Sequence, residues 1–247
     1  MFKGYPRRDL TFGDYFWMLF TSSLFVQFIA GVIGGVLVTF AYGGRLAEAT
    51  LTAFVGRITI YASILSLFLS ALVIYLRKIP LVNRKGLTSA QWTLIPGLSD
   101  ADWKFLIKYI PASYGLYLIG ATVLEKIVGP QAEAANQVVI ESLFNDLPIP
   151  LMFIMIVIVA PIVEEWLFRG MILCRKGERT GSVVSIAVSS LLFCLVHMPN
   201  NIMAFYTYGA MGLMFAYAVY KTESVEAGIV YHMMNNLLGF ILILILN

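Results

Sequence analysis

The sequence predicts an all-α fold: a polytopic membrane helix bundle of about seven transmembrane helices, with the N-terminus in the cytoplasm. Hydrophobic residues make up 60% of the 247-residue chain, and charged residues only 13%, whereas roughly 25% of the residues of a soluble domain are charged. Several apolar runs also reach the ~20 residues that a helix needs to cross a bilayer. We expect one membrane domain over residues 1–247.

Seven apolar segments are candidates for crossing the membrane. The first is long enough to tilt or to begin as an interfacial helix, is not typical of a cleavable signal peptide, and the fifth is short. The segments are approximately Tyr15–Tyr42, Thr52–Leu76, Phe105–Leu124, Ile149–Cys174, Val183–His197, Ile202–Tyr220 and Ala227–Leu246. Between the third and the fourth, Asn136–Leu147 is expected to form a short interfacial helix. Its apolar side would carry Val138, Val139, Leu143 and Phe144.

Lysine and arginine concentrate in alternate loops, on the side that holds the N-terminus. The opposite loops carry only Arg45 and, at a helix end, Lys126. The twelve cations of the first side are Lys3, Arg7, Arg8, Arg77, Lys78, Arg84, Lys85, Lys104, Arg175, Lys176, Arg179 and Lys221. The positive-inside rule therefore places the N-terminus in the cytoplasm and the C-terminus outside. The net charge of +3 follows from this bias, and no basic stripe indicates a nucleic-acid partner.

Three ionisable residues lie inside the fourth apolar segment: Glu164, Glu165 and Arg169. A charge at bilayer depth costs ~2.5–3.5 kcal/mol on insertion scales, so such residues mark a functional site by default. Neighbouring residues point about 100° apart on an α-helix, and Arg169 follows Glu165 at the i+4 spacing of helical ion pairs. We therefore expect Glu165 to pair with Arg169, whose side chain could reach toward the cytoplasm, and Glu164 to face a cavity. A structural ion pair with one protonated glutamate is the alternative.

The only two histidines of the chain also lie in apolar segments. His197 ends the fifth segment, while His232 and Asn236 are four residues apart in the seventh and share one helix face. One such histidine alone would more often be a packing residue. Together with the glutamate pair, these residues supply the carboxylate and imidazole groups that can activate a water molecule. Cys174 and Cys194 lack CxxC spacing and are expected to be packing residues.

These polar residues form three motifs on successive apolar segments: Glu164-Glu165-x-x-x-Arg169, Phe193-x-x-x-His197 and His232-x-x-x-Asn236, with Pro161 just before the acidic pair. In order and placement they resemble the motifs of the CAAX protease and bacteriocin-processing family, also called CPBP or Abi. This family includes the type II CAAX prenyl endopeptidases. The resemblance covers about Ile149 to Asn236, so residues 149–247 would be the catalytic core and residues 1–148 helices and loops of unassigned role.

The resemblance implies an intramembrane glutamic endopeptidase that uses no metal and no cofactor. Glu164 would be the general base, assisted by His197, while His232 and Asn236 would stabilise the oxyanion. The other two residues of the first motif, Glu165 and Arg169, would lie next to the catalytic residues, where they fix the helix and tune the local electric field. The substrate would be a hydrophobic, lipidated or membrane-associated peptide or protein. Family members suggest bacteriocin or peptide-signal maturation, or self-immunity, in a prokaryotic plasma membrane with lipid as the surrounding partner.

Three alternatives come from other functional classes. A non-catalytic membrane scaffold or immunity protein could keep the fold without the chemistry. A zinc-dependent membrane protease would use Glu164, His197 and His232 as ligands, although the sequence has no HExxH motif. A transporter could also use intramembrane carboxylates, but no internal repeat supports it. The substrate's cleavage site and the oligomeric state have no signature in these residues.

Overall fold

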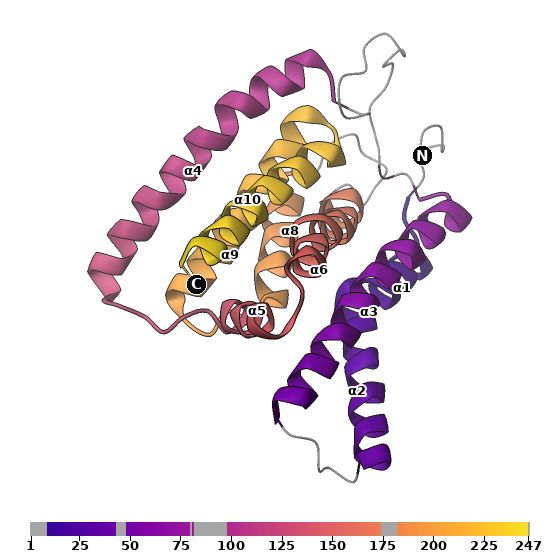
Figure 1. Cartoon of the computed structure of the whole chain (residues 1–247). Coiled ribbons are helices and arrows are strands. Elements are labelled where there is room, and N and C mark those ends of the chain that lie inside the picture. Colours follow the sequence, from indigo (N-terminus) through magenta and orange to yellow (C-terminus); the bar gives the residue numbers. More distant parts are fainter. Residues whose placement is uncertain (1–8, 43–47, 80, 82–97, 174–181, 247) are drawn as a thin grey trace. The chain divides into compact units, whose positions relative to one another are not determined.

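The computed structural model describes residues 9–42, 48–79, 81, 98–173 and 182–246 (Figure 1). Its described residues form helices and no β-strand, which confirms the predicted all-α fold. The predictions for Cys174 and for most of the loop cations lie outside these residues. Those cations are Lys3, Arg7, Arg8, Arg45, Arg84, Lys85, Arg175, Lys176 and Arg179. The cytoplasmic placement of the N-terminus therefore stays a prediction.

Up to residue 146, the described residues form the helices α1 (Phe12–Thr21), α2 (Ser23–Tyr42), α3 (Glu48–Arg77), α4 (Asp100–Val128) and α5 (Ala135–Asp146). The segment Ile149–Leu173 is helical throughout but not uniformly α-helical. It consists of α6 (Ile149–Phe153), the π-helical η2 (Ile154–Val159), α7 (Ala160–Glu165) and the π-helical η3 (Trp166–Leu173). The C-terminal helices are α8 (Val183–Val196), α9 (Ile202–Thr222) and α10 (Val225–Leu246).

Four helices among the described residues are long and apolar enough to cross a membrane, namely Phe54–Arg77, Ile149–Leu173, Ile202–Thr222 and Val225–Ile245. They correspond to the second, fourth, sixth and seventh predicted segments. The fifth is a shorter apolar helix, Val183–Val196, as expected. The first predicted segment is divided, because the extended backbone of Ser22 ends α1 before α2 begins. The total of seven spans stays a prediction.

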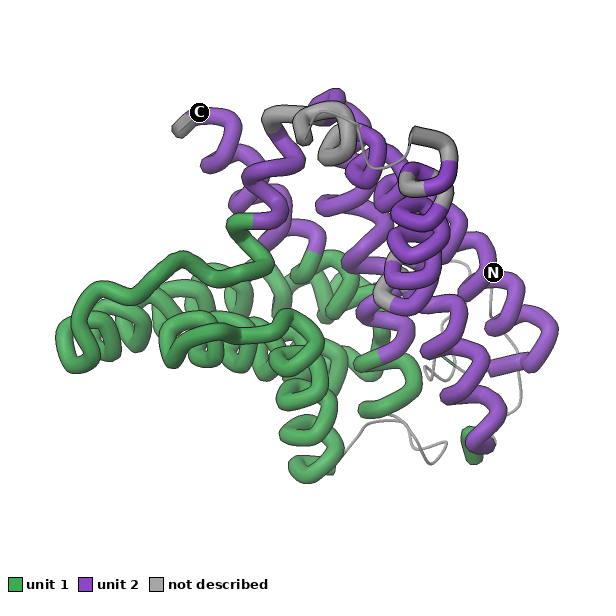
Figure 2. The backbone as a smooth tube through the Cα atoms, turned by 90° about the horizontal axis from the view of Figure 1, so that it is seen from below, with its two compact units in different colours: residues 1–10, 80–138, 168–232 green, residues 11–79, 139–167, 233–247 purple. Residues whose placement is uncertain are grey.

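The chain forms two compact units, and each is assembled from three separate stretches (Figure 2). Unit 1 consists of Met1–Leu10, Pro80–Val138 and Phe168–His232. Unit 2 consists of Thr11–Ile79, Val139–Leu167 and Met233–Asn247. Both units combine residues from before and after position 149, where the resemblance begins. The prediction of a single membrane domain stays a prediction.

In unit 1, α9 packs closely against α8 and also lies along α4. A Cβ atom built on Gly212 would lie 2.9 Å from the carbonyl oxygen of Ser190 and 3.0 Å from the Cα atom of Ser190. The backbones of α8 and α9 therefore approach each other closely at a residue that has no side chain. The Tyr109 hydroxyl donates to the Met214 carbonyl at 3.2 Å, and Tyr206 donates to the Tyr117 carbonyl at 3.0 Å. Tyrosine hydroxyls therefore hold α4 to α9.

Cys194 packs in unit 1 as predicted. The residue is fully buried and forms a hydrophobic cluster with Ala204 and Tyr208 of α9. Its thiol lies 3.5 Å from the carbonyl oxygen of Phe205. These contacts make Cys194 part of the α8–α9 packing.

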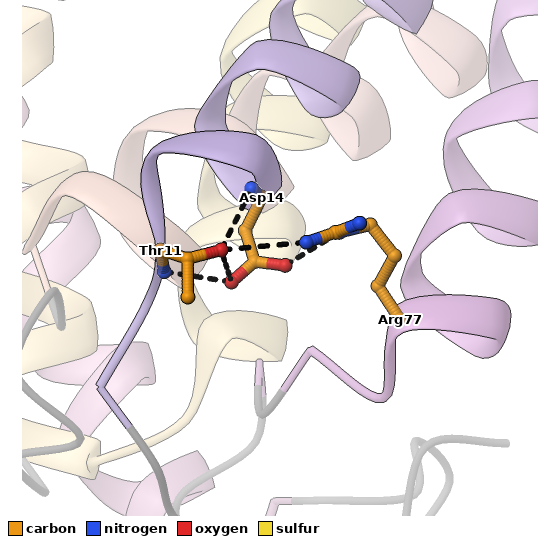
Figure 3. Close-up of polar contacts among 3 residues, drawn as sticks. All are labelled: Thr11, Asp14 and Arg77. Carbon is orange, nitrogen blue, oxygen red and sulfur yellow. Dashed lines mark hydrogen bonds and ion pairs between the residues drawn. The ribbon is translucent and has the colours of Figure 1, made fainter.

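In unit 2, helices α1 and α2 pack against α3, and a buried carboxylate fixes the start of α1 (Figure 3). Asp14 accepts hydrogen bonds from the backbone N–H and the hydroxyl of Thr11, at 2.8 and 2.9 Å, which closes a capping box. The same carboxylate pairs with Arg77 Nε at 2.6 Å. The ion pair therefore ties the first turn of α1 to the last turn of α3.

Unit 2 also contains a hydrophobic cluster, which is formed by Ile60, Leu147, Met152, Met155, Val157 and Phe240. Leu143 and Phe144 of α5 pack against it, which confirms the short helix predicted there. Val138 and Val139, however, are 49% and 56% exposed. The expectation that all four residues share one apolar side of an interfacial helix stays a prediction, since the apolar side of such a helix would face the lipid and not this cluster.

Gly212→Ala should destabilise the protein by about 1–3 kcal/mol, the usual cost of forcing an extra carbon into a packed contact. The reason is that Ser190 backbone atoms, not a flexible side chain, occupy the space. Gly209→Ala on the same helix is the matched control, since its new Cβ meets nothing within 4 Å. Melting in detergent tests this, and equal melting temperatures for the two variants would contradict the close approach.

Candidate active site

The predicted site residues divide between the two units. Unit 1 holds Arg169, His197 and His232. Unit 2 holds Glu164, Glu165 and Asn236. Each group is described below within its own unit.

The three site residues of unit 1 gather around the ring of Phe193, which is buried on α8. The Phe193 ring centroid lies 4.5 Å from that of His197 and 5.5 Å from that of His232. The Cζ atom of Arg169 lies 4.5 Å from the same ring. Three residues that are far apart in the sequence thus share one aromatic neighbour.

Arg169 is fully buried, and its Nη2 donates a hydrogen bond to the Gly212 carbonyl at 2.8 Å. Its guanidinium also lies over the rings of Phe215 and Phe168, at 5.6 and 5.9 Å. The expectation that Arg169 reaches toward the cytoplasm is therefore wrong. Aromatic faces and a backbone carbonyl give the cation its partners inside the protein.

His197 follows the last residue of α8, and its ring is held on two sides. Nδ1 lies 2.7 Å from the carbonyl oxygen of Phe193. A carbonyl can only accept, so Nδ1 carries the proton and Nε2 of the neutral ring is a hydrogen-bond acceptor. The ring also stacks on Tyr208, with centroids 4.5 Å apart and planes inclined by 24°. His197 can therefore accept a proton through Nε2.

His232, on α10, is buried and also stacks on an aromatic ring. The centroid of its ring lies 4.5 Å from that of Phe215, and the two ring planes are inclined by 22°. The ring also makes an edge-on contact with Phe193. The preceding residue, Tyr231, shares a hydrogen bond of 2.6 Å with Ser113 of α4. These contacts fix the start of α10 and the orientation of the imidazole.

In unit 2, a proline explains where Asn236 binds. In η2 the hydrogen bonds run from residue i to i−5, and the Ala160 N–H donates to the Met155 carbonyl. The next such bond would run from Pro161 to Ile156, but proline has no N–H. Nδ2 of Asn236 donates to this carbonyl instead, at 2.9 Å. Asn236 thus takes the place of a missing backbone donor.

The amide of Asn236 is oriented by this bond and by its neighbour. Asn235 Nδ2 donates to Asn236 Oδ1 at 3.2 Å, and Asn236 remains partly exposed. Nδ2 carries a second N–H besides the one directed at Ile156. That second N–H is the group that could donate to a developing oxyanion.

The two glutamates end α7, the short α-helical stretch between η2 and η3. Glu165 is fully buried, whereas Glu164 is partly exposed. The different roles that the sequence indicates for the two glutamates stay predictions. Arg169 lies in η3, where the π-helical turns do not follow the α-helical spacing on which the predicted Glu165–Arg169 pair was based. The ion pair stays a prediction.

Sequence reasoning missed three residues of α9 that contact the predicted residues of unit 1: Tyr208, Gly212 and Phe215. Their i, i+4, i+7 spacing is visible in the sequence, but an apolar helix face of this kind is usually only a packing surface. Within the described parts of either unit, no three side chains of His, Cys, Asp or Glu form a cluster that could hold a metal ion.

Sequence comparisons with known proteins find relatives among membrane proteases. The family model described as "Type II CAAX prenyl endopeptidase Rce1-like" matches residues 146–238, which include all three motifs. The chain is 28% identical to "Putative membrane peptidase YdiL" of Bacillus subtilis, over 90% of this chain and 86% of that protein. It is 29% identical to "Membrane-embedded CAAX protease MroQ" of Staphylococcus aureus, over 57% of this chain and 58% of that protein. No solved structure matches the chain.

The family match and the motifs cover the same part of the chain, and the relatives are bacterial membrane proteins. Two of the three motifs lie on helices that are long and apolar enough to cross a membrane, Ile149–Leu173 and Val225–Ile245, and the third lies at the end of the shorter apolar helix Val183–Val196. The chain is therefore an integral membrane protein of the bacterial plasma membrane, and in sequence it is similar to membrane proteases of the CAAX protease and bacteriocin-processing family.

Proposed function

We propose that this protein is a glutamic-type intramembrane endopeptidase. The observation that carries the proposal is the orientation of His197, whose Nδ1 faces the Phe193 carbonyl, so that Nε2 is the proton acceptor. A second support is the anchored amide of Asn236, which keeps an N–H for an oxyanion. A histidine acceptor and an oriented donor are two of the elements that peptide hydrolysis by activated water requires.

In the proposed reaction, the carboxylate of Glu164 takes a proton from a water molecule, with His197 Nε2 accepting a hydrogen bond from that water. The water oxygen forms a bond with the scissile carbonyl carbon, and the carbonyl electron pair moves to its oxygen. His232 and Asn236 donate hydrogen bonds to this oxyanion. Such stabilisation is usually the largest single contribution to the rate enhancement in acyl transfer. The C–N bond then breaks, and the proton held by Glu164 passes to the leaving amine.

The proposed substrate is a hydrophobic, lipidated or membrane-associated peptide or protein. The motif residues lie on or beside helices suited to a membrane, so a substrate must present its scissile bond from the lipid or its interface. The printed names of the family model and of MroQ, which refer to CAAX proteins and prenyl groups, also favour a lipidated chain end. Maturation of a bacteriocin or peptide signal, or self-immunity, is the proposed biological setting.

Glu164→Gln should abolish cleavage, by ~10²–10⁴-fold or more in turnover, because the amide keeps the side-chain volume but cannot accept the proton. The measurement is cleavage of a library of hydrophobic and lipidated quenched peptides by purified protein in detergent. Glu125→Gln, an exposed carboxylate on α4, is the matched control and should cleave normally. Wild-type turnover in Glu164→Gln would remove Glu164 from the role of base, and cleavage by neither protein would favour the non-catalytic scaffold.

Glu165→Ala and Arg169→Ala should each destabilise the protein more than Glu164→Ala does. Removing one partner of a buried ion pair leaves the other charge without compensation, which costs ~3–5 kcal/mol. The double variant Glu165→Ala/Arg169→Ala completes a cycle that isolates the pair from other effects. Detergent melting of the wild type and of the four variants is the measurement. Strictly additive losses would show that Glu165 and Arg169 do not pair.

Activity should survive exhaustive chelation, and Asn236→Ala should lower turnover by ~10²–10³-fold, the loss typical of one oxyanion donor. Asn236 separates the mechanisms, because an amide is a poor zinc ligand but a good donor. Asn236→Asp keeps the shape and replaces the N–H groups with acceptor atoms, so it should be equally impaired. Loss of activity with chelator and recovery with zinc would instead support the zinc protease that uses Glu164, His197 and His232.

A further inference from the structure

Helix α9 carries none of the three motifs, yet it contacts every site residue of unit 1. We propose that the face of α9 formed by Tyr208, Gly212 and Phe215 is the surface that positions His197, Arg169 and His232 for catalysis. This inference rests on the proposed function, because it assigns positioning residues to the histidines of that mechanism. The i, i+4, i+7 spacing brings the three residues to one side of the helix.

Tyr208 stacks on the face of the His197 ring, and the Nδ1 edge of that ring is bound to a backbone carbonyl. The stack between the two rings leaves the imidazole little freedom to rotate, since Nδ1 is already bound to the Phe193 carbonyl. Tyr208 is itself buried, and Asn136 Nδ2 lies 3.4 Å from its hydroxyl. The Tyr208 hydroxyl thus contacts the first turn of α5, while the ring itself provides the stack on His197.

Gly212 supplies a backbone carbonyl, one helical turn further along the same face. The close approach of α9 to Ser190 of α8 leaves no room for a side chain at this position. Ser189 of α8 donates to the Phe168 carbonyl at 2.7 Å, which brings η3 to the same place. The Gly212 carbonyl then accepts the hydrogen bond from Arg169, so the packing of the helices fixes the guanidinium.

Phe215 completes the face and serves two site residues. It is fully buried, its ring stacks on His232, and the Arg169 guanidinium lies 5.6 Å from its centroid. The ring of Tyr231 also packs edge-on against Phe215, with the two ring centroids 5.2 Å apart. Phe215 therefore keeps a fixed orientation of its own, which a positioning residue needs.

Fixed orientation has a measurable consequence for catalysis. A displacement of about 1 Å of a catalytic group can cost about 10²-fold in rate. A leucine at 208 or 215 keeps an apolar side chain but removes the planar surface on which an imidazole stacks. The loss should therefore appear in kcat, with little change in KM, because neither ring is assigned a contact with the substrate.

The chain offers two matched controls on the same helix. Tyr206 stacks on Tyr117 of α4, with centroids 5.8 Å apart and an angle of 11°, and Tyr217 lies 5.3 Å from Tyr109 of α4. Each is two residues from one of the positioning residues and loses a ring contact when replaced by leucine. A merely structural role for aromatic rings on α9 would affect all four positions alike.

The first measurement is the turnover of full-length protein in detergent. The probe is an internally quenched hydrophobic peptide that the wild type cleaves and Glu164→Gln does not. Tyr208→Leu and Phe215→Leu should lower kcat by about 10²-fold, while Tyr208→Phe, Tyr206→Leu and Tyr217→Leu remain close to wild type. Equal losses in the leucine controls, or normal kcat in Tyr208→Leu and Phe215→Leu, would overturn the proposal.

The second measurement needs no substrate and so separates this proposal from the proposed function. The chain has only two histidines, so nitrogen-15 labelling of histidine gives two ring systems, assigned with His197→Gln. Tyr208→Leu should change the ring signals of His197 and Phe215→Leu those of His232, while the controls change neither. Unchanged signals in both would overturn the positioning role, whether or not the protein cleaves peptides.

A leucine variant that fails to fold does not remove the test. In the wild type, ring protons of His197 should show through-space contacts to Tyr208, and those of His232 to Phe215. Absence of both contacts would overturn the proposal. Their presence, together with a selective change in the variant that does fold, would support it. Loss of peptide cleavage alone, with these ring signals intact, would count against the proposed function and not against the positioning surface.

Discussion

Polar groups inside a bilayer must find their hydrogen-bond partners within the protein, since lipid tails offer none. In this chain three motif side chains meet that constraint in the same way, by binding a backbone carbonyl. Arg169 binds that of Gly212, His197 that of Phe193 and Asn236 that of Ile156. The side chains that would carry the chemistry are therefore held by the helix framework itself, within each unit.

Aromatic rings supply what the carbonyls do not. A buried arginine in a membrane helix costs ~2.5–3.5 kcal/mol on insertion scales. A hydrogen bond to a charged group contributes about 1.5–3 kcal/mol, and a desolvated cation–π contact about 2 kcal/mol. The Gly212 carbonyl and the ring of Phe193 are two interactions that offset part of this cost for the buried Arg169.

The sequence predicts the helices well where long apolar runs dominate, as in Ile202–Thr222, and it identifies the motif residues by their chemistry. It does not reveal the π-helical turns, because an i→i−5 register has no composition of its own. Pro161 is the one residue in the sequence that indicates an interruption of the regular hydrogen bonding here. The division at Ser22 is hidden for a similar reason, since one extended residue hardly alters an apolar run. Tyr208 and Phe215 look like ordinary core residues until their neighbours are known.

The bond between Asn236 and Ile156 also sets how unit 2 can move. Most helix pairs are held in axial register by the steric fit of side-chain ridges into grooves. Here the amide of α10 completes the backbone hydrogen bonding of η2. A shift by one residue, about 1.5 Å along a helix, would leave the Ile156 carbonyl without a donor in a medium that offers no substitute. The hydrogen bond from Asn236 therefore fixes the axial register of α10 relative to η2.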